Sequence, residues 1–162
     1  MTDTERPKKI PRIYIDTSVI GGCFDEEFAD DSKRLMEAVK RGDFIVLISE
    51  IVLAELGDAP EDVKNLLISL PENMIEKVTV SEEIIGLRDK YIEADILSPK
   101  WLDDAAHVAS ATVAQADAIV SWNFKHIVRL DKMKSYNRVN LASGYDILTI
   151  VSPKEVIIDD EE

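Results

Sequence analysis

The chain has 162 residues, of which 46% are hydrophobic and 31% charged, a composition typical of one globular domain and not of a disordered chain. Its single cysteine, Cys23, excludes an internal disulfide and a cysteine-based zinc site, and no apolar run reaches the roughly 18 to 20 residues that span a bilayer. The formal net charge of −13 argues against general electrostatic attraction to nucleic acid, which requires Lys and Arg against the phosphates.

Polar segments flank the apolar part of the chain. Residues 1–9 contain no apolar stretch of the kind found in a secretory signal, so we expect an N-terminal tail and a cytoplasmic protein without membrane association. Residues 159–162 are all acidic and form a second expected tail, because they have nothing to bury. The predicted domain therefore spans residues 10–158.

Five short apolar runs have the composition of β-strands. They occupy residues 10–15, 44–48, 74–80, 118–121 and 147–151. Apolar strands that are separated by helices are typical of a parallel sheet buried on both faces.

Helical patterns lie between these runs. Apolar residues recur at helical spacing in residues 60–70, a serine cap precedes residues 82–91, and an alanine-rich stripe extends over residues 102–116. The tetrapeptide at residues 152–155 has the form of a capping box, which predicts a final short helix. Alternation of this kind indicates an α/β fold, in which helices cover both faces of an open sheet.

Asp16 directly follows the first predicted strand. Ligands bind outside the carboxyl ends of the strands in such sheets, so this position favours a functional carboxylate. The structural alternative is a helix cap, because Asp16, Thr17 and Ser18 are all good capping residues.

Glu55 lies in the short helix expected after the second strand, with Ser49 as its cap. The rest of this helix is strongly apolar, so we expect it to be mostly buried. A lone carboxylate in a buried helix needs a partner or a metal ion.

Asp103 and Asp104 open the alanine-rich helix, where the helix dipole already favours acidic residues. Asp104 immediately precedes a pair of alanines in the packed stripe, which places it at the margin of the core. We interpret His107, one turn later, as a structural or solvent-facing histidine and not as a ligand.

Asn123 falls just past the fourth strand, at the same edge of the sheet as Asp16, whereas Asp117 precedes that strand and is interpreted as a turn residue. Residues 123–140 contain five basic residues against a single acid, Asp131. This basic segment is either a solvated surface or a track for a nucleic-acid backbone.

Four segments occur in an order and at separations that resemble the PIN-domain family, and within it the VapC-like toxins of type II toxin–antitoxin pairs. They are residues 16–18, 54–56, 104–109 and 119–124, and the resemblance runs from about Ile13 to Ile127. It implies a three-layer sandwich with a central, mostly parallel sheet of about five strands, and an endonuclease that cuts RNA with Mg²⁺ or Mn²⁺. It also implies an antitoxin protein as partner and a homodimer.

The resemblance assigns the metal ligands and catalytic acids to Asp16, Glu55 and Asp104, and the fourth catalytic position to Asn123, where many relatives have Asp. We expect Asp16 and Asp104 to bind the ion directly, because Mg²⁺ takes one or two carboxylates and keeps several waters. Glu55 would bind through water or orient the attacking water, and Asn123 would offer a neutral oxygen. Thr17 or Ser18 would hydrogen-bond a carboxylate or the scissile phosphate. The resemblance is compatible with a site for one metal ion or for two.

Two other functions are compatible with parts of this pattern. A non-catalytic PIN-like interaction module is favoured by the net charge of −13 and by Asn123. A phosphatase of the haloacid dehalogenase type also places an Asp after its first strand, but it needs a second Asp two residues later, where this chain has Ser18.

Overall fold

The computed structural model describes residues 9–156, so the predicted tails lie outside the described residues, apart from Lys9. Its centre is a sheet of five strands in the order β3-β2-β1-β4-β5, and every neighbouring pair is parallel. The strands are β1 Arg12–Ile15, β2 Ile45–Ser49, β3 Ile75–Val78, β4 Ala118–Val120 and β5 Thr149–Val151. The predicted five-stranded sheet is confirmed, although most strands are shorter than the apolar runs.

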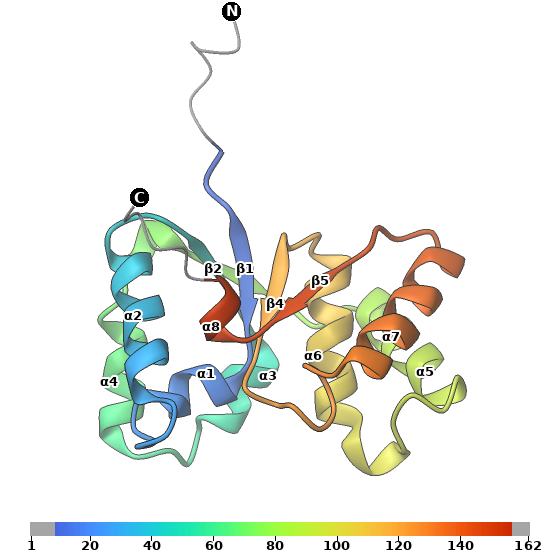
Figure 1. Ribbon diagram of the computed structural model, residues 1–162, viewed down its shortest axis with the longest axis horizontal. Helices are drawn as coiled ribbons and strands as arrows, with labels where there is room; N and C mark the ends of the chain where they lie inside the picture. Colours follow the sequence, from blue (N-terminus) through green and yellow to red (C-terminus); the bar gives the residue numbers. More distant parts are fainter. Residues whose placement is uncertain (1–8, 157–162) are drawn as a thin grey trace, which may run out of the picture.

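Helices connect the strands and cover both faces of the sheet (Figure 1). They are α1 Thr17–Gly22, α2 Ala29–Lys40, α3 Glu50–Glu55, α4 Glu61–Ile68, α5 Glu82–Glu93, α6 Leu102–Val113, α7 Leu130–Ala142 and α8 Pro153–Val156, with short 3₁₀ helices η2 Glu72–Met74 and η3 Pro99–Trp101. None of the helices between residues 9 and 156 is long and apolar enough to cross a membrane.

The predicted helix starts are confirmed by their capping contacts. Ser49 Oγ accepts the backbone N–H of Val52 at 3.3 Å, and Ser81 Oγ accepts that of Ile84 at 3.2 Å. In the capping box of α8 the backbone N–H of Ser152 donates to Glu155 Oε2 at 2.7 Å. Each contact satisfies a backbone or side-chain group that would otherwise lack a partner at the helix start.

Helices α2 and α7 complete the alternating order, although the sequence did not locate them. Leu35, Met36 and Val39 form the buried face of α2. In α7 only Tyr136 and Asn140 are buried, so its apolar stripe is narrow. Most of helix α7 lies in the basic segment at residues 123–140, whose many charged residues obscure the helical pattern.

Side chains of β1 alternate between two separate cores. Ile13 and Ile15 pack in the core beneath α1, α2 and α4, whereas Tyr14 packs on the opposite face, beneath α5, α6 and α7. Figure 1 shows these two groups of helices on opposite sides of the sheet, which confirms the three-layer sandwich.

The strand order places a switch point between β1 and β4. From β1 the chain adds β2 and β3 on one side, and then crosses to add β4 and β5 on the other. The crevice outside the carboxyl ends of two such strands is where open α/β sheets bind ligands. Asp16 follows β1, and Ser121 follows β4, at this crevice.

Candidate functional site

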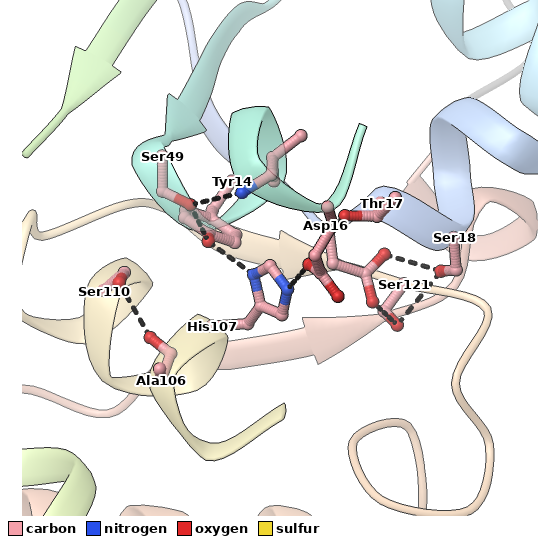
Figure 2. A network of polar contacts seen from close by, with 11 residues as sticks. Tyr14, Asp16, Thr17, Ser18, Ser49, Ala106, His107, Ser110 and Ser121 are labelled. Carbon is pink, nitrogen blue, oxygen red and sulfur yellow. Dashed lines mark hydrogen bonds and ion pairs between the residues drawn. The ribbon is translucent and has the colours of Figure 1, made fainter. Parts of the chain in front are cut away.

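Asp16 is buried at the switch point, with 4% of its surface exposed. It occupies the N-cap position of α1, but its side chain does not cap the helix, so the capping interpretation is wrong. Instead Ser18 Oγ donates to Asp16 Oδ1 at 2.5 Å and Ser121 Oγ donates to Asp16 Oδ2 at 2.6 Å (Figure 2). Two hydroxyls from different segments therefore hold this carboxylate.

Burial raises the pKa of Asp16 above its ordinary value, and the negative charge of Asp104 raises it further. The charge of His107 and the hydrogen bonds from Ser121 and Ser18 oppose this shift without cancelling it. Ionised Asp16 is therefore costly in the protein alone, and a nearby cation would remove that cost.

The two serines also join the start of α1 to the loop after β4. Ser18 Oγ accepts the backbone N–H of Trp122 at 2.9 Å, and Ser121 Oγ accepts that of Asn123 at 2.9 Å. Each hydroxyl thus accepts one hydrogen bond from the loop and donates one to Asp16.

Trp122 anchors this loop to the helical layer. Its indole N–H donates to Ser32 Oγ at 2.7 Å, and its ring stacks on Phe28 with the centroids 4.3 Å apart. Gly22 permits this approach, because a Cβ at that position would lie 2.6 Å from Ser32 Oγ and 2.8 Å from Trp122 Nε1.

Glu55 lies at the end of α3, and the expectation that this helix is mostly buried is wrong. Val52 is the buried residue of α3, while Leu53 is 42% exposed and the Glu55 side chain is 34% exposed. The reason is that α3 is one short helix at the open carboxyl edge of the sheet.

The carboxylate of Glu55 nevertheless has partners within the fold. Thr17 Oγ1 donates to Glu55 Oε1 at 2.8 Å, and His107 Nε2 lies 2.7 Å from the same oxygen. Oε2 accepts no hydrogen bond from any residue between 9 and 156. Partial burial raises the pKa of Glu55. The hydrogen bond and the charge of His107, together with the hydrogen bond from Thr17, outweigh this effect, so the pKa lies below its ordinary value.

Sequence analysis interpreted His107 as a structural or solvent-facing histidine and did not predict its contact with Glu55. This histidine is 2% exposed, and its Nδ1 lies 2.6 Å from the hydroxyl of Tyr14, which in turn lies 2.7 Å from Ser49 Oγ (Figure 2). If Tyr14 donates to Nδ1, the neutral ring carries its proton on Nε2 and donates it to Glu55. The available signal was the spacing from Asp104 to His107 on α6, since residues three apart share a helix face.

Asp104 lies in the first turn of α6, with its side chain 22% exposed. Its Oδ2 lies 2.7 Å from Nδ1 of His126, whose ring contacts the ring of Trp101 with the centroids 4.5 Å apart. The other oxygen, Oδ1, is not bonded by any residue that the structure describes. His126, like His107, is a histidine partner of a predicted acid.

Asn123 lies in the loop after β4, next to these groups. Its Oδ1 accepts the backbone N–H groups of Lys125 at 3.2 Å and of His126 at 2.9 Å. The side chain therefore holds the turn that presents His126 to Asp104. A direct contribution of Asn123 to catalysis stays a prediction.

The fold brings the three acids to one edge, but not into a closed cage. Within residues 9–156 no group of three His, Cys, Asp or Glu side chains is close enough to hold a metal ion as it stands. The donors themselves fit Mg²⁺ or Mn²⁺, because both prefer carboxylate oxygens and Mg²⁺ keeps several waters that span wider separations. Glu55 and Asp104 each retain one unbonded oxygen, and no Lys or Arg in the described chain forms an ion pair with the three acids.

Two cavities lie beside these acids. One cavity of about 390 Å³ is lined by Glu55, Asp103, Asp104 and residues 99–102. A second, of about 440 Å³, shares Glu55 and Asp103 with the first and continues along α3 to Val80. Together they form a groove along the carboxyl edge.

Comparisons with known proteins agree with this architecture. The PIN domain family matches residues 12–125 of the chain. The crystal structure of VapBC2 from Rickettsia felis, bound to a DNA fragment from their promoter, has a TM-score of 0.56 at 17% identity, covering 87% of this chain and 98% of that chain. VapC20 from Mycobacterium tuberculosis, a Sarcin-Ricin loop cleaving toxin, has a TM-score of 0.51 at 15% identity, covering 84% of this chain and 98% of that one. No curated protein sequence matches the chain. At these identities the structures establish the fold.

Proposed function

Because the chain belongs to the PIN domain family, we propose that it is a divalent-metal-dependent endoribonuclease, which hydrolyses phosphodiester bonds of RNA as the toxin of a toxin–antitoxin pair. The observation that carries this proposal is the set of acids at the switch point. Asp16, Glu55 and Asp104 are held there by hydroxyl and imidazole groups and not by Lys or Arg within residues 9–156. Their negative charge is therefore available to a cation.

In this proposal Asp16 and Asp104 would bind the ion directly, and Glu55 would bind it through water. When bound, Mg²⁺ or Mn²⁺ would lower the pKa of a water and polarise the phosphoryl oxygen. Ser18 and Ser121 keep both oxygens of Asp16 in place. His107 and Thr17 occupy Oε1 of Glu55, which leaves Oε2 to orient the attacking water or accept its proton.

The biological setting is proposed from the relatives. One of the similar structures is a Sarcin-Ricin loop cleaving toxin, and the other is a VapBC2 assembly on promoter DNA. The loop-cleaving toxin favours RNA as the substrate, and the VapBC2 assembly favours an antitoxin protein as the partner. The homodimer stays a prediction that rests on the family resemblance.

Incubation of a mixed RNA pool with the purified protein tests the activity. We expect endonucleolytic fragments with Mn²⁺ or Mg²⁺, and none with a chelator. Asp104→Asn, purified in parallel, is the control for contaminating nuclease. Intact RNA with folded wild-type protein in both metals, or equal cleavage by Asp104→Asn, would contradict the proposal.

A non-catalytic interaction module is the second candidate. It is favoured by the net charge of −13 and by Asn123, whose amide oxygen already accepts two backbone N–H groups. Calorimetric titration with Mn²⁺ separates the two functions, because a nuclease site binds the ion, whereas an interaction module without the site gives no heat of binding.

A further inference from the structure

One wall of the groove beside Asp104 carries an aromatic ring with two lysines over it. Lys100 Nζ lies 5.0 Å from the centroid of the Trp101 ring, and Lys125 Nζ lies 5.6 Å from the same centroid. Both distances fall within the range of cation–π contacts. Lys100 comes from η3 and Lys125 from the loop after β4, so tertiary structure brings the two ammonium groups together.

This cluster is directly connected to the acids. Trp101 and Lys100 line the same cavity of about 390 Å³ as Glu55 and Asp104. The Trp101 ring also contacts His126, whose Nδ1 lies 2.7 Å from Asp104 Oδ2. One residue thus separates the ring from a proposed metal ligand.

The two lysines have no acidic partner within the described chain, although Asp103 lines the same cavity. Two other cations of the basic segment are already engaged: Arg129 donates to both oxygens of Asp131 at 2.6 and 2.7 Å, and Lys132 Nζ contacts the carbonyl of Ile96. In a chain with a net charge of −13, two exposed and unpaired cations beside the acids call for an anionic ligand.

The ligand chemistry follows from the combination of groups. Two ammonium groups bind phosphate oxygens, and basic groups beside an aromatic ring are typical of sites for single-stranded nucleic acid. The adjoining cavity of about 390 Å³ is in the range of small-ligand pockets.

We propose that Lys100 and Lys125, held over Trp101, bind a backbone phosphate of unpaired RNA beside the acids. This inference rests on the proposed ribonuclease function and names two residues that would bind its substrate. Trp101 acts here as a positioning residue, because its ring contacts both ammonium groups and itself lines the groove.

Binding can be measured separately from cleavage, by fluorescence anisotropy of a short labelled unpaired RNA in chelator over a salt series. We expect the double variant Lys100→Gln, Lys125→Gln to bind roughly tenfold more weakly and the salt slope to fall by about 1.4, or about 0.7 per lysine. Lys33→Gln, which changes an exposed lysine of α2, is the matched control and should bind as the wild type does.

Substitutions of Trp101 test the same site independently of the lysines. Trp101→Leu removes the cation–π contacts and should weaken binding about fivefold. Trp101→Phe keeps an aromatic ring and should restore binding to within about twofold of the wild type. This rescue distinguishes an aromatic contribution from a general loss of folding.

The proposal is overturned if the double lysine variant binds RNA with wild-type affinity and salt slope, or if the wild type binds no RNA. It is also overturned if RNA binding is unchanged while binding of an acidic peptide is lost, which would assign the lysines to a protein partner. Cleavage with Mn²⁺ but unchanged binding by the variants would refute this site and leave the nuclease intact. Lysine-dependent binding without cleavage would support the site and refute the nuclease.

Discussion

Carboxylates at the two edges of the sheet have different hydrogen-bonding partners. At the amino edge Arg12, the first residue of β1, donates from Nε to Glu76 Oε1 at 3.1 Å and from Nη1 to the carbonyl of Gln115 at 3.0 Å. Its guanidinium also forms an ion pair with Glu76 Oε2, and its backbone N–H donates to Asp117 Oδ2 at 2.7 Å. Asp117 is therefore a structural residue, as the sequence indicated.

At the carboxyl edge, Asp16, Glu55 and Asp104 receive hydrogen bonds from serine, threonine and histidine instead. An arginine partner neutralises a carboxylate within the fold, whereas hydroxyl donors orient it and leave its charge in place. The partner of an acid, more than the acid itself, thus distinguishes a stabilising residue from a functional one.

The largest expected effect is on the rate of RNA cleavage, and it is tested by replacing one acid at each edge. Asp16→Asn should lower metal-dependent RNA cleavage roughly a hundredfold or more, because several kcal/mol of charge stabilisation depend on the bound ion. Asp117→Asn, at the other end of the same pair of strands, should cleave at the wild-type rate. Initial rates in Mn²⁺ measure both, and similar losses in the two variants would remove the distinction between the edges.

Asp16→Asn should also fold, and in chelator it should be more stable than the wild type at neutral pH. The pKa of Asp16 is raised in the folded protein, so its contribution to stability is present below the ordinary pKa of about 3.9 and is lost as pH rises through the folded value. Denaturant unfolding from about pH 4 upwards should show the advantage of the variant growing with pH. A constant difference would contradict the burial effect.

The second effect concerns the histidine that orients Glu55. His107→Ala should lower kcat about 10- to 100-fold, the usual loss for residues that orient a metal site, and leave KM nearly unchanged. Tyr14→Phe removes the hydroxyl 2.6 Å from His107 Nδ1 and should lower kcat by a smaller factor.

Tyr91→Phe is the matched control for Tyr14→Phe, because Tyr91 is equally buried and its hydroxyl bonds Asn140 away from the acids. It should lower stability without changing kcat. If both tyrosine variants lose the same stability and neither changes kcat, His107 has a structural role only.

The third prediction tests whether Asn123 lies close to the bound ion. Asn123→Asp keeps an oxygen for the backbone N–H groups of Lys125 and His126 and adds a negative charge at the carboxyl edge. We expect Mn²⁺ to bind about tenfold more tightly, since repulsion from the other acids offsets most of the added attraction. Calorimetry of both forms measures it, and identical affinities would place Asn123 outside the influence of the ion.

The smallest effect lies at the amino edge. Glu76→Gln weakens the partly exposed pair with Arg12 and should lower the free energy of unfolding by about 1 kcal/mol, close to fivefold in the folding equilibrium. RNA cleavage should be unchanged. A loss of activity without a loss of stability would show that charge at this edge also reaches the site.

The sequence by itself determined the strands, their order along the chain and several helix starts. Apolar runs and serine caps are local patterns, and the contacts of Ser49 and Ser81 follow from them. The place of Asp16 directly after β1 is equally local, which is why its arrival at the carboxyl edge was predictable. The sequence also predicted that Thr17 or Ser18 would hydrogen-bond a carboxylate or the scissile phosphate, and in the structure both hydroxyls donate to carboxylates.

Only the tertiary structure decided which groups hold these acids. Tyr14 and His107 are 93 residues apart in the chain, and they meet because β1 and α6 pack in the same core. The exposure of α3 and the approach of Lys100 to Lys125 over Trp101 likewise depend on neighbours in space. Burial and partner choice are properties of packing between distant segments, so local periodicity contains no information about them.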